Sequence, residues 1–278
     1  MPGFTSRDDL INELTVNGKR DEWQFVKTAP TTCVVGVMDS LWKGVGSPGA
    51  GSDPATTPGT VLTSDATAQT AGSIWFPDRS TDLRFLLAFG AMSTQNGSLI
   101  LYDRLAGVSG VSLTSTGAKT VNSGALDRYS GTAAADNEVW LEVTTAFTTN
   151  SLTANLGSYT SADGSTAQVG GSIVTPVASA TLNKLITMPL GASKQGVRSV
   201  EAGLTVGGTA PVAGAVNVLI VRRLATIPLL ANIWNEVSFL DDVASLPQVY
   251  DNACLGLAWM ANATTVPIVQ GRVFCAYG

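Results

Sequence analysis

A two-residue alternation of apolar and polar side chains recurs along the chain after Thr31. Residues 138–143 place Val, Leu and Val between Glu, Trp and Glu, and the same rhythm returns at residues 152–156 and 199–206. Successive side chains of a β-strand point to opposite faces of a sheet. The alternation therefore predicts strands with one packed face and a second face that meets solvent or a neighbour.

Further strands and turns are predicted from local composition. Residues 216–221, VNVLIV, form an almost unbroken apolar run that favours a strand buried on both faces, and residues 266–277 predict a long C-terminal strand. Turn-forming clusters separate these segments. Short strands between turns, with few helical patterns, predict a mainly β fold: an antiparallel β-sandwich or a jelly roll.

Two segments interrupt the strand rhythm. Residues 44–59, GVGSPGAGSDPATTPG, are rich in glycine and proline and predict a loop or an extended arm. Residues 229–250 have a mixed pattern that fits a short helix or a long loop over one end of the sheet. We expect residues 31–278 to form one β-rich domain, with two packed β modules as the alternative.

The first 30 residues differ from the rest and predict a helical N-terminal arm. Ser6 precedes two aspartates in the manner of a helix cap, and the next apolar residues follow helical spacing. We expect residues 1–27 to dock on a partner, with packing on the protein's own domain as the alternative. The candidate interface residues are Leu10, Ile11, Leu14, Trp23 and Phe25.

Charge and cysteine content limit the partners of the chain. Only 13% of the 278 residues are charged, and the formal net charge is −5. No basic stripe for phosphates is present, so nucleic-acid binding is not expected. No apolar run is long enough to span a membrane, and residues 1–10 do not form a secretory signal. We expect Cys33, Cys254 and Cys275 to be reduced and buried, with a Cys254–Cys275 disulfide as the alternative.

The chain contains no histidine, which removes the commonest general base and histidine-dependent nucleophiles. Residues 44–49 match the glycine spacing of a dinucleotide loop, but the prolines at 48, 54 and 58 forbid the helix that must follow it. Ser109 lies in an incomplete nucleophile motif. Asp241-Asp242 is an adjacent carboxylate pair with no visible partners. We therefore expect no catalytic residue, no cofactor and no metal site.

Large aromatic residues admit two interpretations. Trp75-Phe76 and Trp234 could stack on sugars, but aromatic residues in a β-rich chain more often anchor cores or interfaces. Low charge favours the second interpretation, because interface cores are depleted in Lys, Glu and Asp. The composition thus predicts that neighbouring subunits cover much of the surface.

Three segments resemble structural proteins of tailed bacteriophages. They are residues 152–171 (LTANLGSYTSADGSTAQVGG), residues 196–201 (GVRSVE) and residues 222–228 (RRLATIP). The resemblance covers the last half of the chain. It implies a virion protein that is made in the cytoplasm of a bacterial host.

The resemblance and the composition together predict a non-enzymatic capsid decoration or cement protein on the capsid surface. Its expected partners are the major capsid protein or other virion proteins, and further copies of itself, most plausibly in a homotrimer. A tail or baseplate component, including a receptor-binding tip, is the alternative. A glycan hydrolase that uses carboxylates alone is a more remote one.

Overall fold

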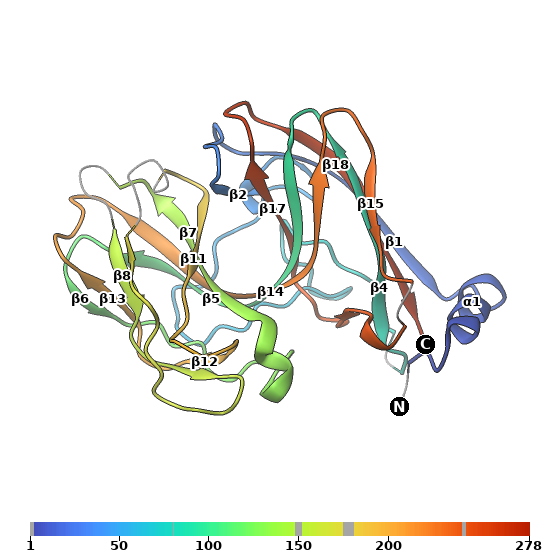
Figure 1. Ribbon diagram of the computed structural model, residues 1–278, viewed down its shortest axis with the longest axis horizontal. Helices are drawn as coiled ribbons and strands as arrows, with labels where there is room; N and C mark the ends of the chain where they lie inside the picture. Colours follow the sequence, from blue (N-terminus) through green and yellow to red (C-terminus); the bar gives the residue numbers. More distant parts are fainter. Residues whose placement is uncertain (1–2, 80, 148–151, 175–180, 241–242) are drawn as a thin grey trace.

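The computed structural model describes residues 3–79, 81–147, 152–174, 181–240 and 243–278. The fold is mainly β, with 44% of residues in strands and 8% in helices, and the strands pair in antiparallel sheets. Figure 1 shows the strands of a closed barrel between an open sheet at one end and a small sheet at the other. The predicted β class is confirmed, whereas the sandwich or jelly-roll arrangement is not.

The centre of the molecule is a closed antiparallel barrel. Its strands pair in the order β11-β2-β17-β5-β14-β7, and β7 returns to β11. Within the closed part of the barrel, each strand has a partner on both sides, so no edge is free there. Their bounds are β2 Met38–Ser40, β5 Gly97–Ser112, β7 Asn137–Thr145, β11 Lys184–Met188, β14 Ala215–Leu229 and β17 Leu255–Ala261.

The remaining strands form an open sheet and two smaller sheets. The open sheet has the order β15-β4-β18-β1-β3, with β16 also paired to β4; its strands are β1 Arg20–Thr28, β3 Gly46–Ser47, β4 Arg84–Ser93, β15 Asn235–Ser238, β16 Gln248–Val249 and β18 Ile268–Tyr277. The smaller sheets are β10-β8-β13-β6 and β12-β9, with bounds β6 Gly117–Lys119, β8 Thr153–Leu156, β9 Tyr159–Ser161, β10 Ile173–Val174, β12 Val197–Val200 and β13 Leu204–Gly207.

The described helices are short. They are the α-helix α1, Arg7–Thr15, and the 3-10 helices η1 Leu41–Lys43, η2 Gly131–Asp136 and η4 Val243–Ser245. Among the described residues, no helix has the length and apolar character needed to cross a membrane.

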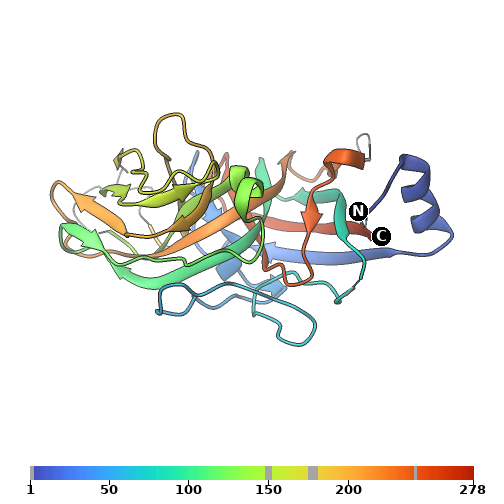
Figure 2. The same ribbon diagram turned by 90° about the horizontal axis from the view of Figure 1, so that it is seen from below.

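The two longest strands, β5 and β14, pair with each other from Gly97↔Leu229 to Ser112↔Ala215. Three register shifts along this ladder increase its local twist, as β-bulges do. Both views show the two strands running from the side of the open sheet toward the small four-stranded sheet (Figures 1 and 2). This pair therefore connects the two ends of the molecule through the barrel.

The barrel strands are buried on both faces. Residues 216–221 are all buried, which confirms the prediction from their apolar run. In β7 the alternation predicts a second face toward solvent or a neighbour, but Trp140 and Glu142 are both fully buried. Cross-strand pairing places this second face inside the barrel, beside Met38, Tyr102 and other members of an interior cluster. The polar positions of β7 are thus interior positions.

The alternation at residues 199–206 does not form one strand. It is divided between β12 and β13, and Gly203 lies between them with a φ of 58°. A Cβ atom at Gly203 would stand 1.8 Å from the carbonyl oxygen of Lys119. Only glycine fits this turn, because other residues rarely adopt a positive φ and would also collide with β6.

The helical arm predicted for residues 1–30 is shorter than expected and packs on its own chain. Only Arg7–Thr15 is helical, capped by the Ser6 side chain, which accepts a hydrogen bond from the Asp9 amide. Residues 20–28 are strand β1, paired along their whole length with β18. Leu10 is fully buried in a cluster with Leu87, Leu246 and Ala276. The expectation that the arm avoids its own sheet is therefore wrong.

The glycine- and proline-rich segment is held against β1. Gly46-Ser47 forms β3, and the buried Lys27 ammonium donates to the carbonyl oxygens of Gly44, Pro48 and Gly49 at 2.7, 3.1 and 3.0 Å. A Cβ atom at Gly44 would stand 2.0 Å from the Thr28 carbonyl oxygen. The first glycine of the apparent dinucleotide motif thus permits strand contact, and no helix follows it.

We predict that replacing Leu10 with alanine destabilises the protein itself. Leu10 is fully buried, whereas its neighbour Ile11 is 46% exposed. Leu10→Ala should lower the free energy of unfolding by about 2–5 kcal/mol, the usual cost of a core leucine. The matched control Ile11→Ala should change it by less than about 0.5 kcal/mol. Urea unfolding followed by fluorescence measures both values, and equal, small effects would show that α1 does not belong to the core.

Candidate functional site

Charged residues are unusually frequent in the interior of this protein. The chain has 16 lysines and arginines and 21 aspartates and glutamates, and nine of those that the structure describes are buried. Buried charges are costly unless they are paired or hydrogen-bonded. The nine are Asp21, Lys27, Asp39, Arg84, Asp103, Arg104, Arg128, Glu142 and Lys184. The partners of each group decide whether it has a structural or a chemical role.

Asp103 in β5 is the acceptor for three donors. The Arg128 guanidinium donates to it twice, from Nε to Oδ2 and from Nη2 to Oδ1, both at 2.9 Å. The backbone amide of Cys254 donates to Oδ1, also at 2.9 Å. Arg128 further donates to the carbonyl oxygens of Leu62 and Arg104. Asp103 and Arg128 thus join β5, the residue that precedes β17 and two loops, and they have a structural role.

Arg104, the next residue, lies inside the barrel. Its guanidinium is 3.7 Å from Glu142 and 4.2 Å from the centroid of the Trp42 ring. Glu142 also accepts hydrogen bonds from Ser40 and from Asn217. The carboxylate is therefore surrounded by groups from three other barrel strands, which neutralise it and orient it.

Asp53, in the glycine- and proline-rich segment, completes this interior cluster of polar groups. It accepts a hydrogen bond from Asn217 at 2.6 Å and forms an ion pair with Lys43 at 2.8 Å. The neighbouring Ser52 carbonyl oxygen accepts from the Trp42 indole at 2.8 Å. These contacts hold residues 51–53 in place. Figure 2 shows the chain that follows residue 50, in light blue, along the outside of the molecule.

Two further buried pairs have the same character. Lys184 in β11 pairs with Asp39 in β2, next to Cys33. Asp21 in β1 accepts from Arg84 in β4 at 2.9 Å. Each pair joins strands or segments that are distant in sequence, and each satisfies a charge that would otherwise destabilise the interior.

The fold does not bring together the residues that the sequence offers as candidates for catalysis or metal binding. Asp241-Asp242 lies outside the described residues, and Ser109 in β5 donates its backbone amide to a loop carbonyl oxygen. Within the described part of the chain, no group of three or more Cys, Asp or Glu side chains could hold a metal ion. Cys33, Cys254 and Cys275 are free and buried, so the predicted state of the thiols is confirmed.

The five candidate interface residues occupy different environments. Leu10 and Phe25 are core residues, and Leu14 packs against the Leu10 cluster. Trp23 is half-buried and stacks edge-on against Trp75, with ring centroids 5.4 Å apart. Of the five, only Ile11 is exposed, at 46% of its surface. They therefore do not form one exposed surface.

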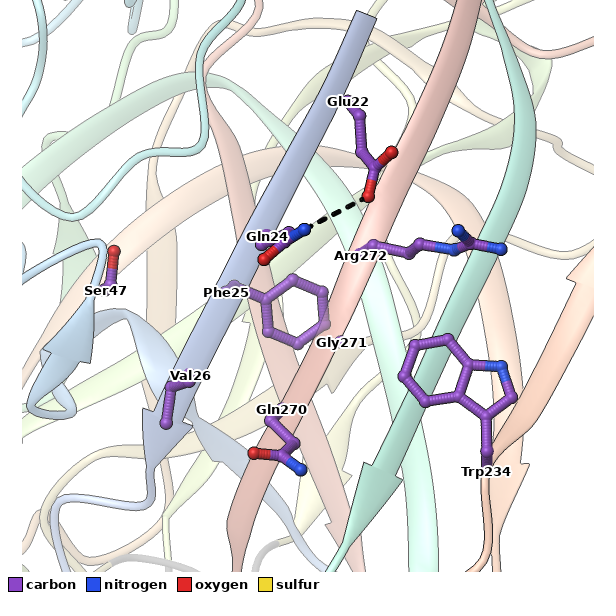
Figure 3. A pocket seen from close by; sticks show the side chains of 9 residues that line it. All are labelled: Glu22, Gln24, Phe25, Val26, Ser47, Trp234, Gln270, Gly271 and Arg272. Atoms are coloured by element: carbon purple, nitrogen blue, oxygen red, sulfur yellow. Dashed lines mark hydrogen bonds between the residues drawn. The ribbon is translucent and has the colours of Figure 1, made fainter.

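A groove lies on the exposed face of the open sheet. Its volume is about 670 Å³, within the range of small-molecule sites. Figure 3 shows it across β1 and β18, with Trp234 on one side and Ser47 on the other. Its lining residues are Glu22, Gln24, Phe25, Val26, Ser47, Trp234, Gln270, Gly271 and Arg272.

Trp234 forms one wall of the groove, and its neighbours fix the position of its ring. The residue is 45% exposed and immediately precedes β15. A Cβ atom at Gly90 in β4 would stand 2.7 Å from the indole, so the ring lies directly over a glycine. The Arg272 guanidinium is 5.9 Å from the ring centroid and forms an ion pair with Glu236 at 3.1 Å. The aromatic face is thus held between fixed neighbours.

Polar side chains form the rest of the groove. Gln24 in β1 lies opposite Arg272 in β18, and Val26 lies opposite Gln270. The Gln24 amide donates weakly to Glu22 at 3.4 Å. The sequence singles out Trp234 but not its companions, because the pairing of β1, β4, β15 and β18 brings them together from distant segments. The period of two in β1 places the exposed glutamine next to the groove.

Comparison with known proteins gives no family. No family model matches the sequence, and no curated protein matches it. A solved structure described as "Structure of infectious bursal disease virus Gt strain" is 12% identical to the chain, with a TM-score of 0.15. The alignment covers 93% of this chain and 66% of that one, so the chain spans just under two thirds of its length. A similarity at this level carries no argument about fold or function.

Burial sets the pH dependence of stability through the three thiols. It raises the pKa of Cys33 and of Cys254 from 9.0 to about 12, and it also raises the pKa of Cys275. A thiol of this kind stays protonated in the folded state while the unfolded chain ionises. Its stabilising contribution is therefore present below pH 9 and decreases as the pH rises above that value. Lys27 acts in the opposite direction, because burial lowers its pKa to about 8.

We predict that the free energy of unfolding decreases between pH 9 and pH 10.5. Three thiols outweigh one lysine, and each group contributes a slope of about 1.4 kcal/mol per pH unit. Cys254→Ala should make the decrease shallower, and Lys27→Met should make it steeper. Urea titrations at several pH values measure the slopes. A free energy that stays constant over this range, or the same slope in both variants, would contradict the prediction.

Proposed function

We propose that this protein is a non-enzymatic structural component of a tailed-phage virion, specifically a decoration or cement protein of the capsid. Its partners would be the major capsid protein or other virion proteins, together with further copies of itself. The resemblance of residues 152–171, 196–201 and 222–228 to phage structural proteins is one support. We also propose that the sheets are packed as in a β-sandwich or a jelly roll.

The burial of charged side chains is the main observation that supports the proposal. Among the described residues, nine charged side chains of an already small set are buried, and their partners belong to this same chain. The surface therefore holds even less charge than the composition indicates. A solvated monomer normally carries a more charged surface. Interface cores, in contrast, are depleted in Lys, Glu and Asp, so a surface of this kind suits contact with neighbouring subunits.

Exposed apolar side chains give a second support. Large apolar residues at least 42% exposed occur on both the open sheet and the opposite end of the molecule. Scattered examples occur on any protein surface, but such residues also form the contacts of assemblies. The set comprises Ile11, Val16, Val26, Val35, Val45, Val169, Val174, Leu182, Val212, Leu230, Ile233, Trp234 and Ile268.

Cementing requires several contacts at the same time. A protomer that buries about 1,600 Å² against each of several partners gains avidity, because every contact after the first is intramolecular. The closed barrel suits this task, since it places rigid surfaces at both ends of the β5–β14 pair. A tail or baseplate part is the second candidate, and the Trp234 groove favours it because a receptor-binding tip needs an outward-facing cavity.

We predict that the purified protein forms a closed homo-oligomer, with a trimer as the expected order. The reason is the low surface charge, which favours covered faces over solvated ones. Light scattering coupled to gel filtration at micromolar concentration should give three times the mass of one chain. A stable monomer under these conditions would count against the proposal.

Copy number on particles separates the two candidate locations. Peptide counting by mass spectrometry on purified particles should show this chain at a level comparable to the major capsid subunit if it decorates the shell. A level far below that of the capsid subunit would instead assign it to the tail. Complete absence from purified particles would show that the chain is not a virion component.

A further inference from the structure

We propose that the groove beside Trp234 binds a short neutral oligosaccharide. In this site Trp234 is the stacking surface, and Gln24, Gln270 and Arg272 supply hydrogen bonds. The proposal goes beyond a role in the virion and does not depend on it, because it concerns the chemistry of one cavity. Figure 3 shows these four side chains around the same space.

The charges of the groove favour a neutral ligand. Arg272 is already paired with Glu236, through its Nη2 at 3.1 Å and its Nε at 3.4 Å. Glu22 adds a negative charge at one end of the groove. No lining residue therefore supplies an unpaired cation for a phosphate or a carboxylate. A nucleic acid, which binds mainly through its phosphates, does not fit this arrangement.

The aromatic wall favours a ligand with an apolar face. The π face of an indole is partly negative and attracts the slightly positive C–H groups on one side of a pyranose ring. Trp234 is 45% exposed, and its ring packs over Gly90 next to Arg272. Because the ring is held before the ligand arrives, little conformational entropy is lost on binding.

The polar side chains match hydroxyl groups. Each glutamine amide carries both donors and an acceptor, and a sugar hydroxyl also donates and accepts. Gln24 and Gln270 are exposed and project from adjacent strands, on the same face as Arg272. The guanidinium of Arg272 is oriented by Glu236, so its remaining N–H groups have a fixed direction. A polyhydroxyl ligand can satisfy all of these groups at once.

The size of the groove fits a short chain and not a single small ion. A volume of about 670 Å³ lies in the middle of the range for small-molecule sites. The lining residues come from β1, β3, β18 and the turn before β15, so the groove crosses the strands of the sheet. A linear oligosaccharide can lie across it, with one ring on Trp234 and the next near the glutamines.

Titration calorimetry and indole fluorescence on the full-length protein test the proposal. The probes are neutral hexasaccharides, namely cellohexaose, maltohexaose, mannohexaose and N-acetylchitohexaose, with hexagalacturonate as the anionic comparison. At least one neutral probe should bind, with a change in indole emission. Trp234→Ala should weaken that binding roughly tenfold or more, the loss expected for one stacking contact.

Further variants separate local effects from general ones. Trp234→Phe should restore part of the affinity, because it keeps an aromatic face. Gln270→Ala should weaken binding, whereas Gln69→Ala, an exposed glutamine outside the groove, should not. Gly90→Ala should also weaken binding, since its Cβ atom would displace the indole. Thermal melts of all variants show whether each remains folded.

Three results would overturn the proposal. The first is no binding of any neutral probe at millimolar concentration. The second is binding that Trp234→Ala and Gln270→Ala leave unchanged, and the third is a preference for hexagalacturonate. If no sugar binds but Trp234→Ala abolishes self-association or attachment to particles, the groove is a protein contact and the assignment to a glycan is wrong.

Discussion

The pairing of β5 with β14 is the constraint on which the rest of the structure depends. The two strands pair along their whole length. Two consecutive residues of β5, Asp103 and Arg104, are buried charges whose side chains point to opposite faces of the sheet. Asp103 faces Arg128 outside the barrel, and Arg104 faces Glu142 inside it. A shift of one residue would exchange these faces and leave both charges without partners. The charges therefore specify the register, although buried pairs of this kind add little net stability.

This use of charge connects the fold to the proposed role. A chain with few ionisable residues places nine of them in its interior, where each is held by partners from other segments. Lys27 fixes the glycine- and proline-rich segment, and Asp21 joins β1 to β4 through Arg84. The surface therefore carries fewer charges than the composition alone indicates. Such a surface is suited to permanent contact with other subunits, and the Trp234 groove is a separate feature of the open sheet.

Local patterns were sufficient for the β class, the doubly buried strand at residues 216–221, the C-terminal strand and the helix cap at Ser6. They were not sufficient for the barrel, because its closure depends on three residues of β2 and on charged side chains that resemble surface positions. Glu142 alternates with apolar neighbours as an exposed residue would, yet its partners come from three other strands. Likewise, Trp234 was visible in the sequence, but Gln24, Arg272 and Gly90 meet it only through long-range pairing.

The location of this chain on a particle is the most direct test of its role as a structural protein. Particles carrying a small epitope tag on this protein can be labelled with gold-conjugated antibody and imaged by electron microscopy, with untagged particles as the control. A decoration protein should give label distributed over the whole shell. Label confined to the tail would support the second candidate location. Particles that remain unlabelled, while the tagged chain is found only in the host lysate, would contradict a structural role in the virion.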